Sequence, residues 1–126
     1  MAEPAARDLT PVFERLRALM APQAGDFDVV HDEPGHYYLN TRHVRADGYV
    51  FMFGAVQIRA RYVSYHLIPV YASAELRDSL SPELRRRMQG KSCFNFTKVD
   101  EGLFAELAEV TARGAALARD PALYGV

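Results

Sequence analysis

The stretch over residues 49–58, YVFMFGAVQI, constrains the fold of this chain more than any other segment. Its aromatic and β-branched residues favour a strand, and their apolar character favours a place in the interior. Gly54 interrupts the run, and a glycine inside a strand marks a bend or a close approach of another backbone. We therefore predict a long central strand over residues 49–58, with Gly54 at such a position.

Further strand-like segments lie on both sides of this central strand, and short turn signals separate them. The segments are FDVVH from residue 27, residues 37–42, residues 62–71 and CFNFTKV from residue 93. The turn between the first two is DEPG, in which proline and glycine supply the backbone angles of a reversal. Pro69 places the end of the 62–71 strand at a sheet edge or a bulge. Consecutive strands joined by short turns predict an antiparallel meander.

Two amphipathic helices frame the strands. We expect the first to have Thr10 as N-cap and Pro11 as first residue, and to end before Pro22. We expect the last to start after the N-cap Asp100 and to end by Asp120. Its predicted buried stripe consists of Leu103, Phe104, Leu107, Val110, Thr111 and Leu117. Two short helices are expected over residues 73–80 and 81–89.

This order of elements predicts an α+β fold. The expected architecture is a five-stranded, mainly antiparallel sheet with the N- and C-terminal helices packed on one face. A chain of 126 residues is long enough to bury one real core, so we predict a single domain over residues 1–126. Residues 1–7 and 121–126 are expected to be loose tails.

The composition excludes several classes of partner. The chain carries 15 Lys and Arg residues against 16 Asp and Glu residues, a net charge of −1, so nucleic-acid binding is not expected. The N-terminal sequence does not resemble a signal peptide, and no apolar run reaches the length of a membrane span, so no membrane partner is expected. One cysteine suggests a reducing compartment. We therefore predict a cytoplasmic protein.

Alternation along two strands predicts a ligand site. Ser64 and His66 face one side of their strand, and Cys93 and Asn95 face one side of theirs. If these strands lie near each other, the polar groups line a semi-polar surface that could hold a small molecule or anion. The candidate ligand-binding residues are Tyr62, Ser64, His66, Lys91, Cys93 and Asn95. The alternative is that these residues simply face water on an open sheet.

No motif in the sequence indicates an enzyme. The sequence contains no Ser-His-Asp order and no glycine-rich fingerprint, so we favour a non-catalytic protein. If the protein is an enzyme instead, Cys93 or His66 is the expected reactive group. A third reading is a homodimer that uses exposed aromatic side chains on the uncovered sheet face. The tyrosines considered for that interface are Tyr37, Tyr38, Tyr49, Tyr65 and Tyr71.

Histidines and acids gather at the turn between the first two strands. Neutral imidazole and carboxylate groups suit iron, zinc or manganese, which makes His31, Asp32, Glu33 and His36 candidate metal ligands. A hairpin open to water offers no enclosed coordination sphere, so we expect weak metal binding and no resident cofactor. The alternative is a solvated hairpin tip without a metal.

From about residue 51 to residue 114 the chain resembles the YdhG-like family of small bacterial proteins. The resemblance rests on FMFGAVQIRARYVSYHLIPVY and on LRRRMQGKSCFNFTKVDEGLFAELAEV, above all on Gly90-Lys91-Ser92-Cys93. It implies a frataxin-like α+β fold and a domain of unknown function, with an iron-chaperone label on some members. Iron handling is therefore an alternative function. The first helix offers only Asp8 and Glu14, so the resemblance supports the fold more than the iron.

Overall fold

The structure is a computed structural model that describes residues 8–125. Within this range the strands form one six-stranded sheet in the order β1-β2-β3-β4-β6-β5, and all neighbours pair antiparallel. The strands are β1 (Asp28–Glu33), β2 (His36–Val44), β3 (Val50–Ile58), β4 (Val63–Leu67), β5 (Met88–Gln89) and β6 (Cys93–Phe96). The helices are α1 (Thr10–Met20), α2 (Ile68–Ala72), α3 (Ala74–Asp78), α4 (Pro82–Arg85) and α5 (Glu101–Ala118), with short 3₁₀ helices η1 (Ala21–Asp26) and η2 (Pro121–Tyr124).

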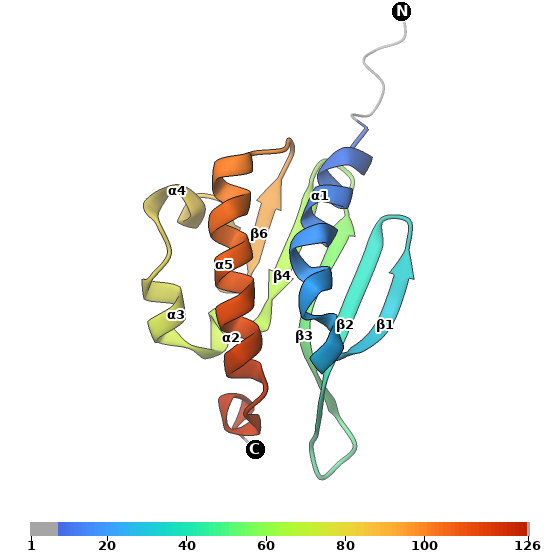
Figure 1. Ribbon diagram of the computed structural model, residues 1–126, viewed down its shortest axis with the longest axis vertical. Coiled ribbons are helices and arrows are strands. Elements are labelled where there is room, and N and C mark those ends of the chain that lie inside the picture. Colours follow the sequence, from blue (N-terminus) through green and yellow to red (C-terminus); the bar gives the residue numbers. More distant parts are fainter. Residues whose placement is uncertain (1–7, 126) are drawn as a thin grey trace, which may run out of the picture.

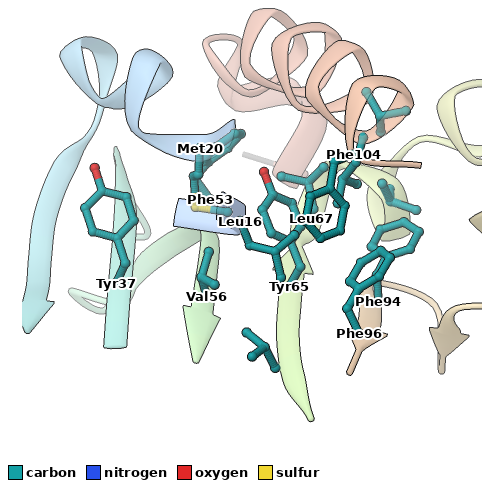
Figure 2. Packing of buried hydrophobic residues seen from close by; sticks show 14 of the residues in the cluster. Leu16, Met20, Tyr37, Phe53, Val56, Tyr65, Leu67, Phe94, Phe96 and Phe104 are labelled. Carbon is teal, nitrogen blue, oxygen red and sulfur yellow. The ribbon is translucent and has the colours of Figure 1, made fainter. Parts of the chain in front are cut away.

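Helices α1 and α5 cover one face of the sheet, as Figure 1 shows. The core lies between this helical layer and the strands, where Tyr65, Phe94 and Phe104 are fully buried (Figure 2). Strand alternation sends the side chains between them, such as His66 and Asn95, to the opposite face. We call this opposite side the open face. The predicted α+β class with one antiparallel sheet is confirmed.

The strand count differs from the prediction of five. The helix expected over residues 81–89 ends at Arg85, and Met88 and Gln89 form β5 instead. These two residues pair with Phe94 and Cys93 across a turn that contains Gly90, whose φ is +77°. Only a residue without a side chain adopts this backbone angle readily, so the glycine reverses the chain here.

The strand expected over residues 62–71 is also shorter than predicted. It ends at Leu67, and α2 starts at Ile68 with Pro69 in its first turn. Proline is tolerated there because the first helical amides have no partner inside the helix. Pro69 is buried against α5, where a Cβ added at Gly114 would lie 3.2 Å from the proline Cβ.

The helix termini agree only in part with the prediction. The Asp100 carboxylate accepts a hydrogen bond from the Leu103 amide at 3.1 Å, which confirms this residue as the cap of α5. At α1 the prediction is wrong, because Thr10 is the first helical residue and Leu9 occupies the N-cap position. Asp8 lies outside the helix and accepts from the Thr10 amide at 3.0 Å.

The C-terminal segment, expected to be a loose tail, contains a short helix that packs on the sheet. Residues 121–124 form η2, and the Tyr124 ring packs on Phe51 with 5.1 Å between ring centroids. Leu117, predicted to be buried, is 37% exposed, because the buried side of α5 passes through Ala115 and Ala118 at this end. Residues 1–7 and 126 lie outside the described residues.

Gly54 of β3 lies at a close approach of the β4 backbone. A Cβ added there would lie 2.7 Å from the backbone oxygen of His66 and 2.8 Å from the terminal methyl of Met20. The register of β2 on β3 also shifts beside it, between Leu39 and Asn40. The predicted close approach of another backbone at Gly54 is confirmed.

Candidate functional site

The sheet brings four of the six predicted ligand-binding residues together on the open face. In the register of β4 on β6, Ser64 lies opposite Asn95 and His66 lies opposite Cys93. On the other side of β4, Ala55 of β3 lies opposite His66. Directly paired residues have Cβ atoms about 5 Å apart, so the four side chains form one continuous patch. We call Ser64, His66, Cys93 and Asn95 the open-face patch.

His66 is fixed in this patch by a residue from the turn before β6. The Ser92 hydroxyl and His66 Nε2 are hydrogen-bonded at 2.7 Å. The backbone oxygen of Ser92 also accepts from the Leu67 amide at 2.8 Å, which ties the turn to β4. The imidazole is therefore held by one polar contact on a rigid strand.

A cation from the end of β3 acts on the same patch. Burial lowers the pKa of His66 below its usual value, and the positive charge of Arg59 lowers it further. Burial raises the pKa of the Cys93 thiol, and the same Arg59 charge partly offsets that rise. The same positive charge therefore acts on the titration of both groups. Among residues 8–125, no carboxylate forms an ion pair with it.

The remaining groups of the patch have partners within the sheet. The Asn95 side-chain amide donates to Gln89 Oε1 at 2.7 Å, and the Ser64 hydroxyl lies 3.4 Å from the Gln57 backbone oxygen. Ser64 and Ala55 are each only 7% exposed although they belong to the open face. Taller neighbours therefore cover these two small side chains.

Two predicted ligand-binding residues are not positioned by strands. Tyr62 lies in the turn before β4, where its backbone oxygen accepts from the Arg59 amide at 2.7 Å. Lys91 is exposed in the turn between β5 and β6.

Three surface hollows of about 340, 220 and 310 Å³ lie away from the open-face patch, beside the start of α5, beside its end, and beside the β1–β2 turn. His66 lines none of these three.

The predicted metal ligands are divided between the two faces of the β1–β2 hairpin. His31, Glu33 and His36 converge on the open face. Asp32 pairs across the strands with Tyr37, a residue of the helical face, and binds Arg17 of α1 at 2.9 Å. Asp32 is therefore not brought together with His31 and Glu33, because strand alternation turns it to the other face.

The tyrosines considered for a homodimer interface are also divided. Tyr37 and Tyr65 are 2% and 0% exposed and belong to the core, so they cannot anchor a partner. Tyr49 and Tyr71 are exposed, and Tyr38 is half-buried beside His31 and His36. The five residues do not form one aromatic surface.

Sequence reasoning missed two residues that act on the patch, Arg59 and Ser92. Gln57 of β3 pairs with Ser64 and so lies on the open face. Had the predicted strand been extended by one residue beyond Ile58, alternation would have placed Arg59 on this face too. Ser92 had no comparable signal, because its contact with His66 spans 26 positions of the chain.

Comparisons with protein-family models, with curated proteins and with solved structures found no match to this chain. The resemblance to the YdhG-like family therefore stays a prediction. None of the helices within residues 8–125 is both long enough and apolar enough to span a membrane.

Proposed function

We propose that this protein is a non-catalytic binding module that holds a small anion on the open face of its sheet, beside His66. The observation that carries the proposal is the pairing of β4 with β6, which sets His66 beside Cys93, with the Ser92 hydroxyl 2.7 Å from His66 Nε2. The positive charge of Arg59, which directly follows β3, lowers the pKa of both His66 and Cys93, and no carboxylate of the described residues forms an ion pair with it. By contrast, ion pairs with carboxylates are formed by Arg15, Arg17, Arg42, Arg45, Arg85 and Arg119.

Arg59 supplies the chemistry that an oxyanion requires. A guanidinium presents several N–H donors in one plane and can bind a carboxylate or phosphate through two parallel hydrogen bonds. Its long side chain is exposed, so a ligand can reach it from solvent. The Ser92 hydroxyl adds a donor or acceptor on the β6 side of the patch.

His66 gives the binding a defined dependence on pH. Its pKa is lowered, so the imidazole is mainly neutral near pH 7. A bound anion favours the charged imidazolium and raises this pKa, so binding takes up a proton. For an anion whose own charge stays constant in this range, the affinity is therefore expected to increase as pH falls from about 7.5 to about 5.5.

The test is a titration with inorganic phosphate and with citrate, followed by the NMR signals of the His66 ring and of the patch amides. Arg59→Gln is expected to weaken binding at least about tenfold, because it removes a charge-assisted contact. The matched control is Arg61→Gln, in the same turn and also exposed, which should leave the affinity within about twofold.

Two results would contradict the proposal. One is an affinity for both anions that is the same in Arg59→Gln and in the wild type. The other is a set of shifted signals confined to the start of α5, beside Arg86 and Arg87, instead of the open-face patch.

A further inference from the structure

The tip of the β1–β2 hairpin holds three potential metal ligands on a firmly built turn. Glu33 and His36 are direct cross-strand partners on either side of Pro34 and Gly35. Gly35 has a φ of +81°, and its backbone oxygen accepts from the Ile58 amide at 2.9 Å. This hydrogen bond ties the turn to β3 and fixes the backbone from which the Glu33 and His36 side chains extend.

The ligand atoms of His31, Glu33 and His36 already lie close together. One atom from each residue can be chosen so that all three lie within 4.8 Å of one another. His31 Nδ1 is 2.9 Å from Glu33 Oε1. Ligand atoms around a tetrahedral zinc ion are about 3.3 Å apart, as follows from metal–ligand distances of about 2.0 Å. Binding would require rotation of these side chains to close the remaining gap.

The two imidazole rings must move when they bind one ion. They are stacked, with 4.4 Å between centroids and 20° between planes, and the Tyr38 ring meets both rings edge-on. A metal ion lies in the plane of each ring that ligates it, so two stacked rings must tilt apart to share one. The His31 side chain is 42% exposed and has room for this rotation.

The charges around the cluster favour a cation. Glu33 brings a carboxylate to the cluster, and this carboxylate is paired with His31 itself. Two arginines close to the hairpin form ion pairs with carboxylates other than Glu33. Arg17 binds Asp32 on the helical face, and Arg42 lies 3.3 Å from Asp28 toward the other end of β1.

We propose that His31, Glu33 and His36 form a binding site for a divalent transition-metal ion of the zinc type. Two imidazoles and one carboxylate suit zinc, nickel and copper ions better than calcium or magnesium, which prefer oxygen ligands only. Three protein ligands leave a fourth position for water or an exchangeable ligand. This site does not depend on the anion site, because the two use different residues on different strands.

The test is calorimetric titration of the full chain with Zn²⁺. His31→Gln and His36→Gln are each expected to lower the zinc affinity at least about tenfold, since each removes one of three ligands. Asp32→Asn is the matched control, an acid of the same hairpin on the opposite face, and should change the affinity less than about twofold. Far-UV circular dichroism without metal checks that each variant keeps the fold.

A second measurement separates this site from the thiol of the open-face patch. Co²⁺ bound to the wild type should show the visible bands of a four-coordinate ion and no thiolate charge-transfer band, and Cys93→Ser should leave the spectrum unchanged. The proposal is overturned if Cys93→Ser abolishes zinc binding. It is also overturned if folded His31→Gln and His36→Gln variants bind zinc as the wild type does, or if Asp32→Asn loses as much affinity as they do.

Discussion

Replacing Gly54 by alanine should strongly destabilise the protein, because β3 and β4 leave no space for a Cβ. The added atom would lie 2.7 Å from the His66 backbone oxygen, whereas ordinary contact begins at 3.4 Å. The two strands would have to separate locally by about 0.7 Å, the difference between these distances. The Met20 methyl at 2.8 Å can move away, but the oxygen belongs to a central strand paired on both sides.

Overpacking of a rigid site costs about 1–3 kcal/mol, and a clash with backbone belongs at the upper end of that range. For a chain of this length, a loss of about 3 kcal/mol lowers the melting temperature by about 12 °C. Urea unfolding followed by far-UV circular dichroism gives the free energy directly. Gly25→Ala is the control, since an added Cβ there meets nothing within 4 Å. A Gly54→Ala protein within about 0.5 kcal/mol of wild type would refute the reasoning.

Leu107 is fully buried, so Leu107→Ala should cost about 2–5 kcal/mol in the same unfolding assay, and an unchanged midpoint would remove it from the core. The Tyr65 hydroxyl donates to Thr111 Oγ1 at 2.6 Å, and Thr111 donates to the Leu107 oxygen at 2.7 Å. Tyr65→Phe should therefore cost about 1 kcal/mol, and Thr111→Val more, because it leaves the buried tyrosine hydroxyl unpaired; the reverse order would contradict this direction of donation. Burial raises the pKa of Cys93, so iodoacetamide should alkylate this thiol more slowly than it alkylates glutathione near pH 7.5. Arg59→Gln should slow the reaction a further two- to fivefold or so, because it removes a charge that lowers this pKa. Faster alkylation in that variant would contradict the effect assigned to Arg59.

Local patterns in the sequence determined the types of most elements and the faces of their side chains. The alternation of Ser64, Tyr65 and His66 places these residues on opposite faces wherever β4 lies, because the period of a strand is two. The cap at Asp100 and the close approach at Gly54 were likewise predictable, since each depends on the properties of one residue type in its own segment.

Tertiary structure decided which of these faces meet. The patch of His66 and Cys93 exists because β6 pairs with β4, and no local pattern encodes this neighbour relation. Contacts between distant segments are fixed by strand order and register, which depend on the packing of the whole sheet. In the same packing, Asp32 forms an ion pair with Arg17, and the His31 and His36 rings stack on the open face. The sequence thus supplied the candidate groups, and the fold determined which of them lie together.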